Sequence, residues 1–422
     1  MRNCMMKNPL SKKNCIVIVD AFSTGRLLAE KWSRYALLLH VQSSAHRPEA
    51  FVNSLPHEIF YDQFVFNGNW PLLWQWLDQY AIDEVVCGSE FGVLLTDVIA
   101  AELGLKGNPP ELSSARRDKF QMSRALERNG VNSAHCHEAN SVDQAIGHYK
   151  KLSLNKVVVK PLDSAGSEDV YICESSEAVS FATQATLGKV NLMQSDNRSV
   201  LVQEFLEGDE YIVNSVSAEG QHFITDVWKS CKVRESGGRI IYSHEILQDA
   251  NQKATTVISD YIYQVLDALQ ILWGPAHSEL ILTERGPILL ETGARLSGLA
   301  NPPALSLATG HNQVSLSVDA YRGPESLLKL AGKPYHKTHS AYCINLIAPY
   351  DAKIDKENFE RNLTELKSFH SLSYRRSSGL FSRTVDLNSS PGVVFLVHEN
   401  EDQVVSDYQK LRSMEEVIYR PI

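Results

Sequence analysis

The spacing of strand and helix patterns in the first hundred residues constrains the fold more than any other feature of the sequence. Short apolar runs, typical of buried strands, alternate with segments whose apolar residues recur at helical spacing. The expected strands are residues 15–20, 37–42 and 84–88, and the expected helices are residues 26–35, 71–80 and 90–103. Such alternation with short turns is typical of a doubly wound parallel sheet. We therefore expect an N-terminal α/β domain over residues 1–113, with the Gly and Pro residues of 107–110 near its end.

The rest of the chain loses this alternation. Residues 114–205 begin with a helix pattern at 118–128 and continue with strands that do not alternate strictly with helices, which predicts an α+β subdomain. Residues 206–422 hold mostly antiparallel candidates and a C-terminal extension. The expected strands there are 211–218, 222–229, 239–245, 276–283, 288–291, 340–347 and 393–397, and the expected helices are 254–269 and 401–412. The predicted fold class is α/β, a parallel-sheet domain, followed by two α+β subdomains.

Composition excludes several classes of function. Lys and Arg number 41 and Asp and Glu 50, a net charge of −9, so we expect no general affinity for nucleic acid or for an anionic membrane. No apolar run approaches the roughly 20 residues that span a bilayer. The seven cysteines are scattered and form no CxxC pair, which favours reduced thiols and a cytoplasmic location.

The strongest chemical signal is a pair of glutamates on neighbouring strands. Glu279 and Glu291 lie in two apolar segments separated by Glu284-Arg285-Gly286, a plausible tight hairpin. Antiparallel pairing can bring both carboxylates onto one face, where they need a cation or a shared proton. Oxygen ligands of this kind suit Mg²⁺ together with phosphate groups. The alternative is a hairpin with two solvated glutamates.

Two lysines upstream are candidates for binding phosphate. Lys160 ends the apolar strand Val157–Lys160 and is followed by the turn-prone run Asp163-Ser-Ala-Gly-Ser167. A strand-end ammonium over a loop that includes Ser167 can hold phosphate oxygens with its charge and with the loop N–H groups. Lys119 stands at an expected helix start. Each lysine alone is more often a surface residue.

Residues 202–211 carry a further pattern, in which a strand ends, crosses a short connection and re-enters a new strand at Tyr211. The backbone of such a hinge can bind the edge of an adenine, and apolar side chains can cover its plane. The candidates for this role are Gln203, Glu204, Phe205 and Leu206, and either Glu207 or Glu210 can accept hydrogen bonds from ribose hydroxyls. In isolation the segment is only an acidic turn.

Together, and in this order, these segments resemble the ATP-grasp superfamily of carboxylate–amine ligases over residues 15–320. The resemblance implies that Lys119 and Lys160 contact the phosphates of ATP and that Glu279 and Glu291 bind Mg²⁺, or alternatively Mn²⁺. It also implies that Glu210 is the acid that binds the ribose. The segment Glu291-Thr-Gly-Ala-Arg295 has Gly293 where the family commonly has a metal-binding Asn. This form, with Gly298 after it, resembles the stand-alone L-amino acid ligases, dipeptide synthetases of the bacilysin and dapdiamide type.

The resemblance implies an ADP-forming reaction in which a carboxylate becomes an acyl phosphate that an amine then attacks. We expect a dipeptide from two L-amino acids, with Arg295 stabilising the oxyanion and the 114–205 subdomain acting as a lid. Two alternatives are an amide ligase for a non-amino-acid carboxylate and a nucleotide-binding regulator without turnover. Further expected substrate contacts are Glu90, as a partner for an ammonium group, Trp228, Lys229 and Gly298.

Other motifs are weaker. His135-Cys-His137 can bind a metal, but a lone HxH is usually structural. Trp70 and Trp74 have the i, i+4 spacing of a packed helix face. The expected partners are small molecules only, and the expected assembly is a homodimer.

Overall fold

The computed structural model describes residues 15–164, 166, 168–234, 240–375 and 379–422. The first sheet is fully parallel, in the order β3-β2-β1-β4, which confirms the expected parallel sheet. Its strands are β1 (Cys15–Val19), β2 (Leu37–Gln42), β3 (Asp62–Val65) and β4 (Ile82–Cys87), and its helices are α1 (Gly25–Trp32), α2 (Glu49–Val52), α3 (Trp70–Leu77) and α4 (Val93–Glu102). Sequence analysis missed β3, whose four residues are too short for a clear pattern.

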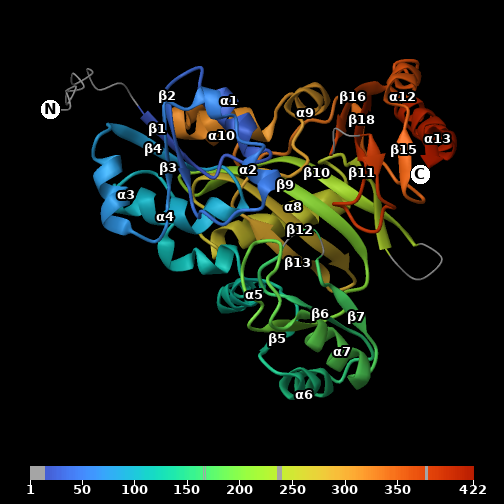
Figure 1. Cartoon of the computed structure of the whole chain (residues 1–422), viewed down its shortest axis with the longest axis horizontal. Coiled ribbons are helices and arrows are strands. Elements are labelled where there is room, and N and C mark those ends of the chain that lie inside the picture. Colours follow the sequence, from blue (N-terminus) through green and yellow to red (C-terminus); the bar gives the residue numbers. More distant parts are fainter. Residues whose placement is uncertain (1–14, 165, 167, 235–239, 376–378) are drawn as a thin grey trace.

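The second sheet is antiparallel, in the order β5-β8-β6-β7, and two helices pack on it (Figure 1). Its elements are β5 (Cys136–Ala139), β6 (Val157–Pro161), β7 (Tyr171–Cys173), β8 (Val200–Glu204), α6 (Val142–Leu152) and α7 (Ser176–Thr186). Helix α5 (Lys119–Arg128) comes before it and is capped by Asp118, which accepts hydrogen bonds from two backbone N–H groups. Figure 1 shows this sheet extending away from the rest of the molecule.

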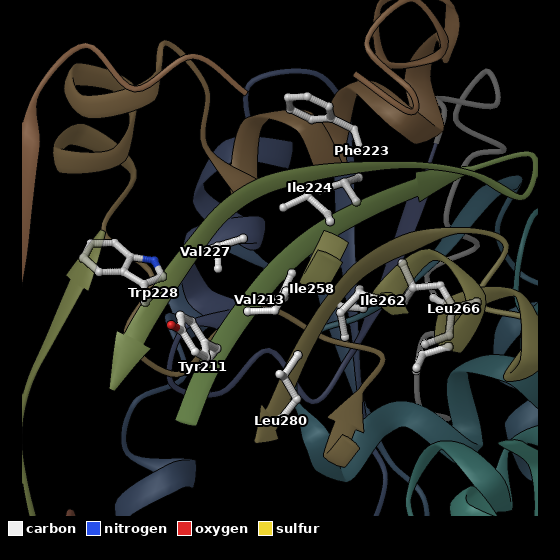
Figure 2. Close-up of a cluster of buried hydrophobic side chains, with 14 of the residues drawn as sticks. Tyr211, Val213, Phe223, Ile224, Val227, Trp228, Ile258, Ile262, Leu266 and Leu280 are labelled. Atoms are coloured by element: carbon white, nitrogen blue, oxygen red, sulfur yellow. The ribbon is translucent and has the colours of Figure 1, made fainter. Parts of the chain in front are cut away.

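The third sheet has eight strands in the order β13-β12-β9-β10-β11-β14-β18-β16. Its strands are β9 (Asp209–Ala218), β10 (Gln221–Arg234), β11 (Ile240–Leu247), β12 (Gly274–Thr283), β13 (Gly286–Gly293), β14 (Ser340–Asn345), β16 (Phe369–Tyr374) and β18 (Gly392–His398). Helix α8 (Lys253–Ala268) covers one face, where Ile258 and Ile262 lie in one apolar cluster with Val213 and Leu280 (Figure 2). Because side chains alternate along a strand, Ile212 and Glu279 face the other way.

The parallel sheet packs against helix α10 (Gln313–Arg322), which follows α9 (Pro302–Thr309). Val314 and Tyr321 of α10 share a buried cluster with Ile16 and Val86 of the parallel sheet. Leu296, from the loop after β13, is fully buried in the same cluster. This packing brings the carboxyl ends of the parallel strands to the loop that carries Arg295.

The C-terminal part adds elements that sequence analysis did not predict. They are α11 (Glu325–Leu328), α12 (Lys356–Leu363) and a small sheet of β15 (Ala352–Ile354), β17 (Leu380–Phe381) and β19 (Tyr419–Pro421). The helix expected at 401–412 is present as α13 (Glu401–Ile418). Phe359 of α12 and Leu411 of α13 are fully buried in one apolar cluster with residues of β14 and β18, so both helices pack on the eight-stranded sheet. The domain boundaries at residues 113 and 205 stay predictions. Among the described residues no helix is both long and apolar enough to cross a membrane.

Candidate active site

The two glutamates are direct cross-strand partners. Strands β12 and β13 form an antiparallel hairpin in which Glu279 pairs with Glu291, so both carboxylates lie on the same face. A two-residue turn, Glu284-Arg285, joins the strands, and β13 begins at Gly286 with φ 95°, a conformation that glycine adopts without strain. The expected hairpin is therefore confirmed. Each carboxylate keeps 27% of its side-chain surface exposed, enough for a bound ion to reach it.

Both candidate phosphate lysines lie beside this pair. The Lys119 ammonium is 2.7 Å from a Glu291 carboxylate oxygen and donates to the Ser164 carbonyl at 3.2 Å. Burial opposes the charge on Lys119, but attraction to Glu291 raises its pKa above the ordinary value. Burial would raise the pKa of Glu291, but Lys119, Lys160 and Arg295 hold it below its usual range.

Lys160, unlike Lys119, has no carboxylate partner among the described residues. It is buried at the end of β6, and no carboxylate of the described chain lies within ion-pairing distance of it. Burial and repulsion from Lys119 lower the pKa of Lys160 to about 8. An ammonium held in this way, near two carboxylates but paired with neither, is suited to an incoming anion.

The segment after β8 is a short connection between two sheets, as expected. Gln203 and Glu204 are buried at the end of β8, and β9 begins at Asp209. Glu204 is held internally, because its carboxylate accepts from His135 N at 2.8 Å and from Arg285 at 2.6 Å. Its backbone N–H also donates to the His135 carbonyl at 2.9 Å, so both the side chain and the N–H of Glu204 fix the connection.

Glu210 lies on the same sheet face as Glu279. One of its oxygens is 2.5 Å from the Lys232 ammonium, while the other is buried without a hydrogen-bond partner. Burial raises the pKa of Glu210, and Glu279 adds to this effect. Leaving a buried acceptor without a hydrogen-bond donor costs free energy, so this oxygen is suited to accept a hydrogen bond from a ligand hydroxyl.

A second charged cluster joins the parallel sheet to the loop after β13. Glu90 follows β4, and its carboxylate lies 2.8 Å from Arg295 Nε and 3.2 Å from Arg117 Nε. Arg117 also binds Asp163 of the loop after β6 at 2.7 Å. Burial would lower the pKa of Arg117, but these two carboxylates raise it. The cluster thus ties three separate segments together around Arg295.

The glycine of the Glu291–Arg295 segment has a steric role. A Cβ on Gly293 would lie 2.4 Å from a Glu90 carboxylate oxygen and 3.3 Å from Arg295 Nε. Any side chain at residue 293 would therefore displace the Glu90 carboxylate. The departure of this segment from the commoner Asn-containing form leaves room for the contact between Glu90 and Arg295.

Two of the predicted substrate residues, Lys229 and Trp228, lie on opposite faces of β10. Lys229 pairs across the sheet with Tyr211, which lies on the α8 face, and its ammonium binds the exposed Asp209 at 2.7 Å. Lys229 therefore faces away from the carboxylates, and its role as a substrate contact stays a prediction. Trp228 faces the same way as Glu279, but it is buried against Phe395, and its indole N–H donates to Asp226 at 2.6 Å.

Glu90 lies beside Arg295, and its two carboxylate oxygens contact the guanidinium groups of Arg295 and Arg117, so its expected role as an ammonium partner stays a prediction. Ser167 lies outside the described residues. Within the described ranges, no group of three or more His, Cys, Asp or Glu side chains is placed to hold a metal ion. His135 and His137 therefore belong to no such group. Trp70 and Trp74 stack at 5.7 Å, as expected of a packed helix face.

Sequence reasoning missed Arg117, Asp163 and His277. Arg117 lies two residues before Lys119 in the sequence. Its side chain is buried in the structure, and no sequence pattern distinguishes it from a surface arginine. His277 lies two residues before Glu279, so strand alternation could have placed it on the same face. Its Nδ1 donates to Asn214 Oδ1 at 2.9 Å, since the Asn214 amide N–H₂ donates to Asp226, and its Nε2 is 3.4 Å from Glu279.

The donor set fits a hard divalent cation. Glu279 and Glu291 offer carboxylate oxygens only, and two lysines beside them can hold phosphate oxygens, which would complete the coordination of the ion.

Comparisons with known proteins agree with this geometry. Residues 154–302 match the model of the ATP-grasp domain. The chain is 32% identical over 419 residues to dapdiamide A synthase of Enterobacter agglomerans, covering 97% of this chain and 98% of that protein. The L-amino acid ligase of Bacillus licheniformis has the same fold, with a TM-score of 0.74 at 18% identity over 95% of this chain and 97% of that one. An ATP complex of carboxyaminoimidazole ribonucleotide synthase from Aspergillus clavatus gives 0.70 at 12% identity over 96% and 99%.

The fold and the arrangement of lysines and carboxylates define an ATP-grasp enzyme. More closely, the chain belongs to the ATP-grasp family of carboxylate–amine ligases that includes dapdiamide A synthase, and it is an ATP-dependent ligase. The resemblance to ATP-grasp carboxylate–amine ligases that the sequence indicated is therefore confirmed.

Proposed function

We propose that this ligase joins two L-amino acids into a dipeptide through an acyl phosphate, releasing ADP and phosphate. The observation that carries the proposal is the convergence of two charged clusters, one of Lys119, Lys160 and two carboxylates and one centred on Arg295. Two relatives support the substrate class. One is named for the synthesis of dapdiamide A and the other as an L-amino acid ligase.

ATP binding is assigned to the region between the second and third sheets, where a pocket is lined by Lys119, Gln203 and Leu289 among others. Gln203, Glu204, Phe205 and Leu206 are proposed to hold the adenine through backbone groups and apolar side chains. The unpartnered oxygen of Glu210 is proposed to accept a ribose hydroxyl. Support comes from the position of these residues on the short connection between β8 and β9.

In the first step a carboxylate oxygen of the first amino acid attacks the γ-phosphorus of ATP, and ADP leaves. Lys119 and Lys160 neutralise charge on the phosphoryl oxygens during transfer. Mg²⁺, when bound by Glu279 and Glu291, would supply further charge neutralisation on the phosphates. The depressed pKa of Lys160 reflects a cation without a partner, which a phosphate would provide.

In the second step the amine of the other amino acid attacks the acyl carbon, a tetrahedral oxyanion forms, and phosphate leaves as the peptide bond closes. Arg295 is proposed to stabilise the oxyanion, and Glu90 orients its guanidinium through the 2.8 Å contact. Gly298 is proposed to leave space for substrate, since no atom lies within 4 Å of a Cβ built there. Trp228 is proposed only as a buried wall of the site.

Acyl phosphates hydrolyse, so water must be excluded. We assign this role to residues 114–205, hinged at 203–206, as a lid over the site. The ion pair between Arg117 and Asp163 supports the assignment, because it connects the loop after β6 to the residues around Glu90.

A phosphate-release screen over pairs of L-amino acids, with simple carboxylic acids as alternative first substrates, tests the proposal. We expect release to require both an amino acid pair and Mg²⁺, with dipeptide detected by mass. Glu291→Gln should abolish turnover, since an amide offers no charge to the ion. Release with a carboxylic acid that is not an amino acid, or release without an amide product, would overturn the proposed substrate class.

A further inference from the structure

The carboxyl ends of the parallel strands form a second polar edge beside the charged cluster. Strand β1 ends before Asp20, β2 before Ser43, and β4 before the Gly88–Glu90 turn. Ligands of open parallel sheets bind at this edge. Gly88 is required there, because a Cβ would lie 2.6 Å from the Asp20 carbonyl oxygen. The turn therefore brings Glu90 and Phe91 close to the ends of β1 and β2.

Arg47 is fixed at this edge by neutral groups. Its Nη2 donates to the Ser43 hydroxyl at 2.5 Å, and its guanidinium carbon lies 4.6 Å from the centre of the Phe91 ring. Asp20 does not pair with it, since one carboxylate oxygen accepts from Ser43 N at 2.8 Å and the other from the Ser43 hydroxyl. Arg47 is thus held in place without a direct contact to a carboxylate of the described residues, although the buried Asp20 lies close enough to act on it electrostatically.

The other guanidinium groups of this region all have carboxylate partners. Arg117 binds Glu90 and Asp163, and Arg295 binds Glu90. No carboxylate of the described chain lies within ion-pairing distance of Arg47, and its Nε–H is buried without a hydrogen-bond partner. A half-buried guanidinium with an unused donor is costly unless an anion binds it.

Arg47 lies close to the reacting centre. Phe91, on which it stacks, directly follows Glu90, the partner of Arg295. Burial lowers the pKa of Arg47 and Arg117 adds to this effect, while Asp20 and, more weakly, Asp163 partly offset it. Arg117 and Asp163 of the charged cluster are therefore near enough to act on Arg47. The phosphate lysines belong to α5 and β6, so Arg47 approaches the site from the opposite side, that of the parallel sheet.

We propose that Arg47 binds the free α-carboxylate of the amino acid that supplies the amine. The inference rests on the proposed dipeptide synthesis, in which this carboxylate stays ionised through the reaction and needs a cationic partner. The planar guanidinium can hold both carboxylate oxygens through parallel N–H donors. Bound there, the second substrate would be oriented by one end while its amine faces the acyl phosphate near Arg295.

The test compares an amino acid as amine substrate with the same amino acid as its C-terminal amide, which keeps the amine and lacks the carboxylate. In the parent enzyme, kcat/KM should be higher for the acid. Arg47→Gln should lower kcat/KM for the acid roughly 10- to 100-fold, the loss expected for a charge-assisted hydrogen-bond pair. It should change kcat/KM for the amide and the KM for ATP less than about 3-fold, so that the preference for the acid disappears.

Two further variants keep the test decisive. Arg47→Lys should retain part of the preference for the acid, because it keeps the charge and loses the planar fork. Arg34→Gln, an exposed arginine on the same domain, should behave like the parent. If the parent enzyme is active and Arg47→Gln keeps the same preference for the acid over the amide, the inference about Arg47 is overturned while the proposed function stands. A parent that ligates neither the acid nor the amide in any pair would overturn the proposed function itself, and with it this inference.

Discussion

The Glu90 carboxylate and the Arg295 guanidinium are joined by a contact of 2.8 Å between residues 205 positions apart in the chain. Glu90 follows the last strand of the parallel sheet, and Arg295 follows β13 of the eight-stranded sheet. The second oxygen of Glu90 binds Arg117. The orientation of the proposed catalytic arginine therefore depends on the N-terminal sheet.

Glu90→Gln should lower the rate of ligation and leave the affinity for ATP nearly unchanged. The amide keeps the size of the side chain but cannot neutralise two guanidinium groups, so Arg295 should lose its fixed orientation. We expect kcat to fall roughly 10- to 100-fold, in line with the loss of a charge-assisted contact. The dissociation constant of an ATP analogue should change less than about 3-fold. Calorimetric titration and steady-state ligation measure both, and equal losses in both would contradict the account.

Gly293→Ala should reproduce this effect by a steric route. The added Cβ would lie 2.4 Å from the Glu90 carboxylate, so the ion pair must shift. We expect turnover to fall at least about 10-fold, because a displacement of about 1 Å in a catalytic group can cost that much or more. Gly147→Ala in α6, where nothing lies within 4 Å of the new Cβ, is the matched control. Parent-like ligation by Gly293→Ala would show that the Glu90 contact is dispensable.

Arg295→Lys keeps the charge and changes its shape. If the planar fork grips an oxyanion while Nε is held by Glu90, an ammonium cannot serve both partners. Turnover should drop on the order of 10²–10³-fold, the loss typical of an oxyanion donor. ATP affinity should be nearly unchanged. Ligation within about 3-fold of the parent rate would remove Arg295 from the reaction.

Lys160 predicts a pH dependence of ATP affinity. Its pKa in the ligand-free protein is about 8, below the ordinary 10.5, so the protonated form that attracts phosphate is lost as pH rises through 8. The dissociation constant of a non-hydrolysable ATP analogue should be flat below pH 8 and rise by up to about tenfold per unit above it.

The variant Lys160→Met should bind the analogue weakly at every pH and lose this rise. Folding supplies an independent readout. Between pH 8 and 10.5 the unfolded chain binds more protons at Lys160 than the folded one, so this residue makes the free energy of unfolding increase with pH there. A binding curve with the same break near pH 8 in Lys160→Met would assign the titration to another group.

The sequence was sufficient for features set by local pattern. The hairpin that pairs Glu279 with Glu291 follows from two apolar strands and the short turn between them, and the position of Lys119 follows from the helix start. Strand alternation also predicts that Trp228 and Lys229, as adjacent residues of one strand, point to opposite faces.

The contacts around Glu90 could not be predicted in this way. Glu90, Arg117 and Arg295 lie in three segments that no local pattern connects, and only the packing of the parallel sheet on α10 brings them together. The small strands β15, β17 and β19 were missed for a related reason, since two- and three-residue strands carry no periodicity. The steric role of Gly293 also depends on a neighbour 203 positions earlier in the sequence.

The most direct test of the central claim follows an oxygen atom. The screen identifies an amino acid accepted as the first substrate, which is then labelled with ¹⁸O in both carboxylate oxygens and ligated in the presence of ATP. If the carboxylate attacks the γ-phosphorus, one labelled oxygen leaves with each phosphate, and the ³¹P resonance of the phosphate shifts accordingly. The account predicts one ¹⁸O in the phosphate for each amide formed. Unlabelled phosphate, or AMP that carries the label, would contradict an acyl-phosphate mechanism.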